Sequence, residues 1–351
     1  MAVHISKRLP SNSVVACLSD RAVLSARPVA VHISKRKTMN TSKEITHFRR
    51  FHKYDYSRGA VEFVTFHLEN RIPILGTITP DAKIWLSQAG KILEDVILYE
   101  GQRNANIDLM HYQIMPEHLH MRLYIHPNTT TPLKLMGQFI SNTKRWSTQK
   151  CRETGISISW QKNYHDRLCL NRNIIEIVDE YMDLNPLKWL LMNSQNPPMR
   201  VLEPLCSPLL PLDEWWTGVG NANLLDGNRP LMSIRLSRKL QMSAVDTILP
   251  PIIGECFKGY IPISTFISPM ELELFRRLSS AGFPMICAVP DSLKTIYRPK
   301  VNQTVLFAQN RLLLISHFQA KDISRESAWN NINDKIAEIA RYSNGMCIYL
   351  R

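Results

Sequence analysis

The chain has 351 residues, 44% of them hydrophobic, which is enough apolar material for the cores of two domains. Its 43 Lys and Arg exceed its 30 Asp and Glu, and the formal net charge of +13 favours a polyanionic partner such as nucleic acid. No apolar run approaches the roughly 20 residues that span a bilayer, so no membrane partner is expected. The seven cysteines are scattered and form no CxxC pair, which is typical of reduced thiols in a cytoplasmic protein.

Residues 1–45 form a basic tail with little apolar periodicity. The tail contains the heptapeptide Ala-Val-His-Ile-Ser-Lys-Arg twice, at 2–8 and 30–36. Two copies are too few for a solenoid, which needs about three. A basic segment that is poor in apolar residues is expected to be disordered. Two alternatives are a DNA-binding arm and, for residues 1–38, translated upstream sequence ahead of a start at Met39.

Residues 46–195 are predicted to form a compact α+β domain. Strand patterns occur at 60–67 and within 108–125, where Pro116 marks a turn. Helical patterns are predicted over 80–100, from Pro132 towards Lys150, and from Asn173 through Tyr181 to Asn185.

Residues 196–212 are rich in proline and are predicted to be a linker. Residues 213–351 follow as a second domain, in which short apolar runs alternate with helical stretches. This alternation predicts a parallel, doubly wound α/β domain. The predicted strands are 231–236, 259–264, 284–289 and 311–316, and the predicted helices are 269–281 and 328–342.

Two histidines stand two residues apart, at His118 and His120, within the second predicted strand region. Alternate residues of a strand point to the same face, so the two imidazoles suit neighbouring positions on one divalent ion. Taken alone the pair is weak evidence, because histidines on a strand face more often bind nothing. Tyr181 and Asn185 are four apart and would share a helical face, but an ordinary amphipathic helix ending at Asn-Pro explains them equally well. The following Pro186 places Asn185 in the last turn of that helix.

A longer series of motifs runs in order along about 150 residues. As a set they resemble the bacterial single-tyrosine HUH transposases, the insertion-sequence 200-like group, and within it the REP-associated tyrosine transposases. The motifs are Tyr54-Asp-Tyr-Ser-Arg-Gly59, Phe63-Val-Thr-Phe66, Asn70-Arg71, Met115-Pro-Glu-His-Leu-His120, Phe139 and Lys144, Trp160-Gln161, Tyr164-His-Asp166 and Tyr181-Met-Asp-Leu-Asn-Pro186.

The resemblance implies an antiparallel sheet with helices, of the ferredoxin or RRM type, and a role for each motif residue. His118 and His120 correspond to the paired ligands of a Mg²⁺ or Mn²⁺ ion, and Asn185 to an auxiliary metal ligand. Tyr181 corresponds to the nucleophile, which would nick single-stranded DNA and rejoin it through a 5′-phosphotyrosine. Tyr164 is the runner-up nucleophile, in a segment where family members vary among aromatic residues.

The implied substrate is single-stranded DNA with a hairpin or palindromic element. Two clusters mix basic and aromatic residues, which suits phosphate contact and base stacking: Arg49, Arg50 and Lys53 in the first, Lys144, Arg145 and Trp146 in the second. Each cluster could equally be a solvated surface. A homodimer is compatible with the resemblance, because members of the family exchange the tyrosine helix between subunits.

Other functions remain open at this point. One alternative is a domesticated or catalytically silent DNA-binding protein that acts on repeated palindromic elements. Another is a metal-dependent phosphohydrolase that uses the histidines without a tyrosine.

The second domain resembles the Rossmann-like domain of DNA-processing protein A. That resemblance implies a phosphate-binding cleft lined by Arg235, Arg238 and Ser268. Gly218-x-Gly220 lacks the full dinucleotide-binding pattern and has little weight. A structural or DNA-docking module without a ligand is the alternative.

Overall fold

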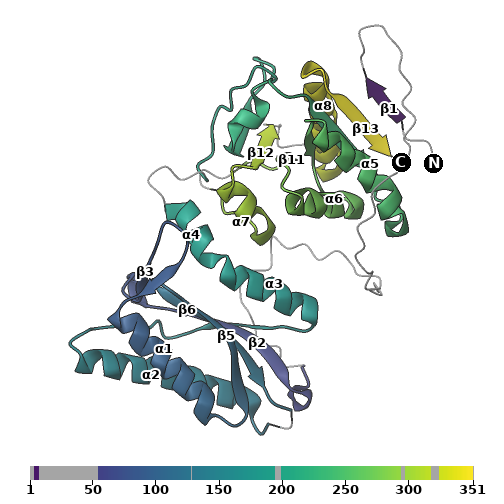
Figure 1. Ribbon diagram of the computed structural model, residues 1–351. Helices are drawn as coiled ribbons and strands as arrows, with labels where there is room; N and C mark the ends of the chain where they lie inside the picture. The colour runs from purple at the N-terminus through teal and green to yellow at the C-terminus, as the bar shows by residue number, and fades with distance from the viewer. Residues whose placement is uncertain are drawn as a thin grey trace.

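The computed structural model describes residues 4–7, 54–127, 129–193, 199–293, 297–317 and 324–350. Its strands form a four-stranded sheet, a seven-stranded sheet and a two-stranded hairpin. The four-stranded sheet and its helices belong to the first half of the chain, and the seven-stranded sheet belongs mainly to the second (Figure 1).

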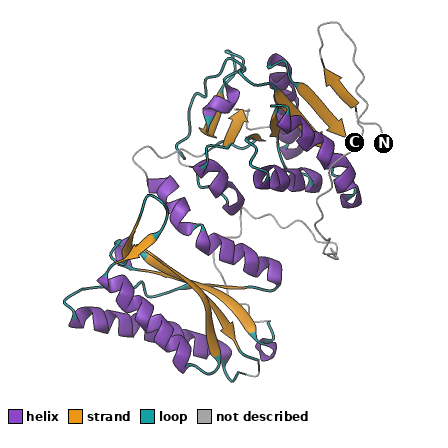
Figure 2. Ribbon diagram, viewed as in Figure 1, coloured by secondary structure: helices purple, strands orange, loops and turns teal. Residues whose placement is uncertain are grey.

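The first sheet has the strand order β5-β6-β2-β7, and all its neighbouring strands are antiparallel. Helices α1 and α2 cover one face and α3 covers the other (Figure 2). An antiparallel sheet with helices confirms the α+β architecture expected for this half. The elements are β2 Ala60–His67, β5 Ile107–Met115, β6 His118–Ile125, β7 His165–Leu168, α1 Gln88–Arg103, α2 Pro132–Glu153 and α3 Arg172–Asp183.

Side chains of β6 alternate between the two faces of this sheet. Leu119, Met121 and Leu123 are fully buried in the core beneath α1 and α2. Burying side chains of this size contributes roughly 1.5–3 kcal/mol each, so a register slip by one residue would be costly. The same alternation directs His118 and His120 to the face that α3 covers.

The expected helix over 80–100 was wrong at its beginning. Residues Ile84–Leu86 form β4, which pairs with β3, Gly76–Ile78, as a hairpin. The helix begins only after Ser87, whose hydroxyl accepts a hydrogen bond from the Gly90 amide at 3.1 Å. A Cβ at Gly90 would lie 2.0 Å from the Leu75 carbonyl oxygen, so only glycine allows α1 to pack this closely.

The single helix expected from Asn173 to Asn185 is two helices. Asn171 caps α3, accepting from the Ile174 amide at 3.0 Å, and α3 ends at Asp183. A new helix, α4, spans Asn185–Asn193. Pro186 lies in its first turn, where the missing N–H has no helical partner to lose. Asn185 therefore begins α4 and does not lie in the last turn of α3.

The second sheet has the order β1-β13-β9-β10-β11-β12-β8. The five inner strands are parallel, as predicted for a doubly wound domain, whereas β8 and β1 join the edges antiparallel. Residues of β1 lie in the tail that was expected to be disordered, and these four pair with the free edge of β13. The strands are β1 His4–Lys7, β8 Trp216–Gly220, β9 Leu231–Leu236, β10 Ile261–Ser264, β11 Met285–Val289, β12 Leu312–His317 and β13 Met346–Leu350.

Helices cover both faces of the second sheet. Buried side chains of α5, α6 and α7 share one core cluster, and those of α8 share a cluster on the opposite face. The helices are α5 Val245–Phe257, α6 Pro269–Ser280, α7 Val301–Ala308 and α8 Arg325–Tyr342. Single 3₁₀ turns occur at η1 Tyr56–Arg58, η2 Glu69–Arg71, η3 Ala222–Leu225 and η4 Met242–Ala244.

The described part of the expected linker, from Met199 onward, is packed against the second sheet. Met199 is fully buried in the same cluster as α5, α6 and α7, and Leu205, Leu209 and Leu210 are buried on the face of α8. These apolar side chains alternate with the prolines, so the stretch can be buried despite its composition. In the part of the chain that the structure describes, no helix is long and apolar enough to span a membrane.

Helix α4 connects the two halves. Leu191 belongs to the buried cluster that includes Leu306 and Phe307 of α7, and Met192 packs against the same cluster. The helix therefore begins next to the first sheet and ends in a core of the second half (Figure 1).

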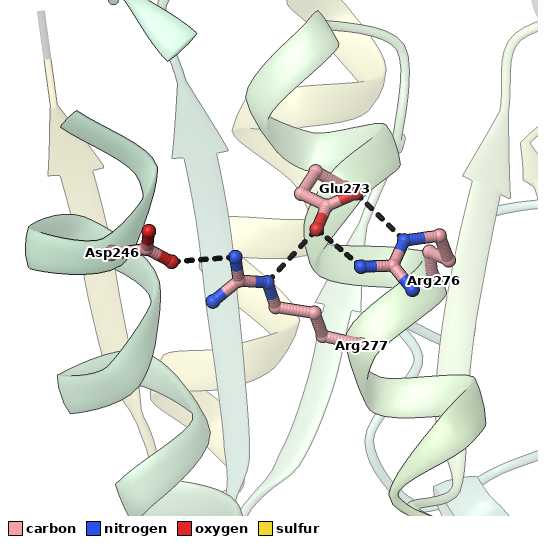
Figure 3. Close-up of polar contacts among 4 residues, drawn as sticks. All are labelled: Asp246, Glu273, Arg276 and Arg277. Atoms are coloured by element: carbon pink, nitrogen blue, oxygen red, sulfur yellow. Dashed lines mark hydrogen bonds and ion pairs between the residues drawn. The ribbon is translucent and has the colours of Figure 1, made fainter. Parts of the chain in front are cut away.

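Ion pairs connect α5 to α6 (Figure 3). Arg277 Nη2 lies 2.7 Å from Asp246 Oδ1, and its Nε lies 2.9 Å from Glu273 Oε1. Arg276 Nη2 lies 2.6 Å from the same glutamate oxygen. Hydrogen bonds from Arg276 and Arg277 outweigh burial and hold the pKa of Glu273 at about 2, below its ordinary value of 4.5.

We predict that Glu273→Gln lowers the free energy of unfolding at pH 7 by about 1–2 kcal/mol. This value is smaller than the pKa shift alone would give, because Arg276 is exposed and solvent screens its ion pair with Glu273. A depressed folded-state pKa gives stability that is present above pH 4.5 and lost as the pH falls towards 2. The melting temperatures of wild type and variant should therefore differ at pH 7 and converge near pH 2. Glu338→Gln, which removes a 3.8 Å pair on the exposed side of α8, is the control and should change little. An equal difference at both pH values would contradict the prediction.

Candidate active site

The two histidines of β6 face each other across a short gap. His118 Nε2 and His120 Nε2 are 3.0 Å apart, and their rings meet edge to face. Both side chains are buried. The strand alternation that buries Leu119 on the opposite face brings these two ring nitrogens together.

The remaining nitrogen of each imidazole has a partner. His118 Nδ1 lies 3.1 Å from Glu117 Oε1, and His120 Nδ1 lies 2.7 Å from Thr65 Oγ1 of β2. A hydrogen bond behind an imidazole sets its orientation and leaves the opposite nitrogen for another partner. Both Nε2 atoms are thereby directed to one point.

A third imidazole lies beside the pair. His67 of β2 is opposite His118 in the strand register, with ring centroids 4.9 Å apart. Burial, followed by the neighbouring His118 and His67, holds the pKa of His120 well below 6.5. Burial, with His118 next, also lowers the pKa of His67 to about 4. His67 and His120 are therefore neutral at pH 7, which is the state that ligates metals.

Tyr181 and Asn185 lie against the same group. The rings of Tyr181 and His120 meet edge to face at 5.4 Å, and Asn185 Nδ2 lies 2.9 Å from His120 Nε2. Burial raises the pKa of Tyr181 above 10, and a hydrogen bond from Asn185 works in the opposite direction. The phenol is therefore protonated at neutral pH and needs activation before it can act as a nucleophile.

Helix α3 is fixed on the sheet by Asp179. Its carboxylate lies 2.7 Å from Arg122 Nε on β6 and 3.1 Å from His111 Nδ1 on β5. His111 Nε2 also lies 3.2 Å from Asp183 Oδ1. These contacts set the position of Tyr181, two residues beyond Asp179 on the same helix.

The donor set fits a hard or borderline divalent ion. In octahedral geometry, two neighbouring ligand atoms that are each about 2.1 Å from the ion and 90° apart around it lie roughly 3.0 Å from each other. The Nε2 atoms of His118 and His120 have this separation. Rotating the Asn185 amide by half a turn exchanges its nitrogen for its oxygen, a ligand that Mg²⁺ and Mn²⁺ accept. Within the described ranges, no three His, Cys, Asp or Glu side chains form a metal-binding group.

The structure separates the two candidate tyrosines. Tyr164 packs against the core beneath α1 and α2, with its hydroxyl 4.0 Å from where a Cβ of Gly137 would lie on α2. Tyr181 packs on the opposite face of the sheet, with Phe63 and Val178. Only Tyr181 lies on the face that carries His118 and His120.

The second basic cluster divides between internal contacts and the surface. Lys144 Nζ donates to the carbonyls of Gln161 and Asn163, at 2.8 and 3.0 Å, and so braces the segment that carries Tyr164. Burial lowers the pKa of Lys144 to about 8. Arg145 is exposed and stacks over the Trp146 ring at 4.4 Å. The first cluster, Arg49, Arg50 and Lys53, lies outside the described residues.

Sequence reasoning missed Thr65, His67 and Lys188. Thr65 and His67 reach the site only through the pairing of β2 with β6, which no local spacing reveals. Lys188 Nζ lies 5.7 Å from the centroid of the Tyr181 ring. Its three-residue spacing from Asn185 on a helical face is a signal that could have found it. In the second half, Arg235, Arg238 and Ser268 line one common cavity.

One protein-family model matches part of the chain. Residues 83–185 match the family model described as "Transposase IS200 like", and this range includes both histidines, Tyr164, Tyr181 and Asn185. No curated protein matches.

Two solved structures are similar to parts of the chain. One is the REP-associated tyrosine transposase bound to a REP hairpin, at 18% identity over 41% of this chain and 74% of that chain, with a TM-score of 0.32. The other is described as a transposase of Deinococcus radiodurans R1, at 14% identity over 39% of this chain and 96% of that chain, with a TM-score of 0.23.

The matched range carries the paired histidines, the tyrosine and the asparagine, and it spans β4 through α3 to the first residue of α4. Through residues 83–185, this chain is similar to the IS200-like transposases.

Proposed function

We propose that the protein is a transposase that nicks and rejoins single-stranded DNA through a covalent 5′-phosphotyrosine on Tyr181. The observation that carries this proposal is the convergence of Tyr181, Asn185, His118 and His120 on one face of the first sheet. A nucleophile beside a pair of imidazoles that can hold a metal is an arrangement suited to phosphoryl transfer to a side chain.

The proposed reaction is a transesterification at phosphorus. The Tyr181 oxygen attacks the scissile phosphate and forms the phosphotyrosine bond, while the bond to the 3′-oxygen breaks and that oxygen takes up a proton. A second 3′-hydroxyl then attacks the phosphotyrosine and releases the phenol. One phosphodiester is exchanged for another, so no external energy source is needed.

His118 and His120, with the Asn185 amide, would hold a Mg²⁺ or Mn²⁺ ion. When bound, the ion withdraws charge from the scissile phosphate and orients it. Glu117 and Thr65 contribute by fixing the rotation of the two imidazoles. Asp179 contributes by holding α3 in register with the sheet.

Lys188 provides a positive charge beside the nucleophile. Its ammonium group lies over the Tyr181 ring, and burial, with Arg298 adding to it, lowers its pKa from 10.5. Among the described residues, no carboxylate lies within ion-pair distance of Lys188. We propose that this charge stabilises the phenolate and the phosphate that it attacks.

The proposed substrate is a single strand that carries a hairpin or palindromic element. The net charge of +13 and the exposed Arg145–Trp146 stack support contact with phosphates and bases. Arg49, Arg50 and Lys53 are proposed to extend this contact. We also propose that residues 213–351 form a Rossmann-like domain akin to that of DNA-processing protein A, and that the protein acts as a homodimer.

We expect Tyr181→Phe to abolish covalent attachment to DNA, because only the phenol oxygen can form the phosphotyrosine bond. Labelled, hairpin-containing single-stranded DNA would be incubated with Mn²⁺ and resolved on a denaturing gel. Tyr164→Phe is the matched control and should keep the adduct, since it alters the opposite face of the sheet. Loss of the adduct with Tyr164→Phe alone would reassign the nucleophile. No adduct with any variant, alongside intact DNA binding, would identify a catalytically silent DNA-binding protein.

We expect His118→Ala and His120→Ala each to weaken Mn²⁺ binding by about a hundredfold or more. Losing only the hydrogen-bond partner behind a metal ligand typically lowers the metal affinity roughly ten- to a hundredfold, and these variants remove the ligand itself. Titration of the protein with Mn²⁺, followed by electron paramagnetic resonance, measures this directly. His126→Ala, directly after the same strand, is the control, because His126 pairs with Asp108 away from the site. Unchanged Mn²⁺ affinity in both site variants would refute the metal assignment.

We expect Lys188→Met to slow adduct formation by roughly a hundred- to a thousandfold, in line with the loss of one charge-stabilising group. Lys188→Arg should restore part of the rate. Single-turnover kinetics at saturating DNA separates this effect from binding. Lys91→Met, on the exposed face of α1, should leave the rate unchanged. A normal rate in Lys188→Met would remove this lysine from the mechanism.

A further inference from the structure

A cavity of about 760 Å³ opens at the second sheet, far along the chain from Tyr181. Its walls are the end of β9 with the residues after it, the segment from the end of β10 to the first turn of α6, the first turns of α8, and Tyr349 near the end of β13. Small-ligand sites have volumes of roughly 300–1,000 Å³. The cavity therefore has room for a small organic ligand.

The cavity lies where the order of the parallel strands reverses. From β9 the chain proceeds through β10 and β11 to β12 in one direction, then crosses the other face through α8 to place β13 on the opposite side of β9. In open α/β sheets, the crevice outside the carboxyl ends of the strands at such a reversal is the general position of ligand sites.

Positive charge is concentrated on this cavity. Arg238, Lys239 and Arg325 line it, and among the described residues none of them has a carboxylate within ion-pair distance. A fourth cation, Arg235, donates to Asn330 Oδ1 at 2.7 Å and lies 3.7 Å from Asp334. Three cations are thus available to an anion.

One buried carboxylate in the cavity wall already has hydrogen-bond partners within the protein. Glu271 accepts hydrogen bonds from the amides of Leu236, Ile267 and Ser268, at 2.9, 2.8 and 3.1 Å. These bonds satisfy its charge and tie the end of β9 to the start of α6. They also fix the backbone that presents Arg238 and Lys239.

Two buried polar atoms in the cavity wall have no hydrogen-bond partner. They are Thr265 Oγ1 and Asn333 Oδ1, in side chains only 3% and 7% exposed. The orientation of the Asn333 amide is determined, because its Nδ2 donates to the Trp329 carbonyl at 2.7 Å. The free atom of Asn333 is therefore an acceptor, and it suits a neutral donor such as a hydroxyl or an amino group.

We propose that this cavity binds a nucleoside phosphate, free or as the terminal nucleotide of a DNA strand. The phosphate pairs with Arg238, Lys239 and Arg325, and the Thr265 hydroxyl donates to it. A sugar hydroxyl or a base amino group donates to Asn333 Oδ1. Trp329 also lines the cavity and offers a planar apolar surface to the base. The proposal is independent of the chemistry at Tyr181.

The test is calorimetric titration of the full-length protein at 0.15 M salt. The ligands are the four nucleoside 5′-monophosphates, inorganic phosphate, and an eight-nucleotide single strand with a 5′-phosphate. Arg238→Ala should weaken binding of the nucleotide by about tenfold or more, as expected for a lost charge-assisted hydrogen bond. Thr265→Val should weaken it as well while leaving the melting temperature unchanged or higher, because it removes a buried hydroxyl that has no partner.

Arg229→Ala is the matched control, since Arg229 is exposed at the opposite end of β9. Tyr181→Phe should bind nucleotides like wild type. Binding of a monophosphate that depends on Arg238 and Thr265 indicates a free nucleotide, and the same dependence for the oligonucleotide alone indicates a strand end. The proposal is overturned if inorganic phosphate binds as tightly as every nucleotide, if no ligand binds, or if both cavity variants bind like wild type.

Discussion

The ion pair between Asp179 and Arg122 determines where the tyrosine lies. Helix α3 buries only Val178 and Met182, so apolar packing alone would leave its position along the sheet poorly defined. Arg122 projects from the same face of β6 as His120, and its bond to Asp179 relates the helix register to the strand register. Because the pair is largely shielded from solvent, it keeps more of its strength than a surface ion pair does.

Burial and the neighbouring imidazoles hold the pKa values of His67 and His120 below their ordinary value. A proton on either of these two rings is disfavoured first by burial and then by a charge on a neighbouring imidazole. Glu117 and Thr65 occupy the outer nitrogens of His118 and His120, so the inner nitrogens have a constrained orientation before any ligand arrives. Preorganisation of this kind lowers the cost of ordering side chains when a ligand binds.

Local periodicity explains which parts of the site were predictable. The two-residue period of a strand placed His118 and His120 side by side, and the structure has them so. The four-residue spacing of Tyr181 and Asn185 predicted that the two side chains lie near each other on one helix. The reason was partly wrong, because α3 ends at Asp183 and Asn185 begins the next helix, α4. His67 could not be foreseen, since its place beside His118 depends on two strands about 50 residues apart aligning in one register. In the second half, continuous apolar runs predicted the parallel strands β9, β10, β11 and β12. The inner strand β13 and the glycine-containing edge strand β8 were not predicted.

Helix α4 lies just before residue 195, where the sequence predicts the end of the first domain, and it contacts both halves of the chain. One end of its nine residues supplies Asn185 to the histidine group, and the other end inserts Leu191 among the side chains of α7. A chain cut after α4 would leave Leu191 exposed to water, because the other buried members of its cluster, among the residues that the structure describes, all belong to the second half. The first half and the second half are therefore not interchangeable modules. Grafting a different domain after Asn193 would also require a replacement for the pocket that receives Leu191.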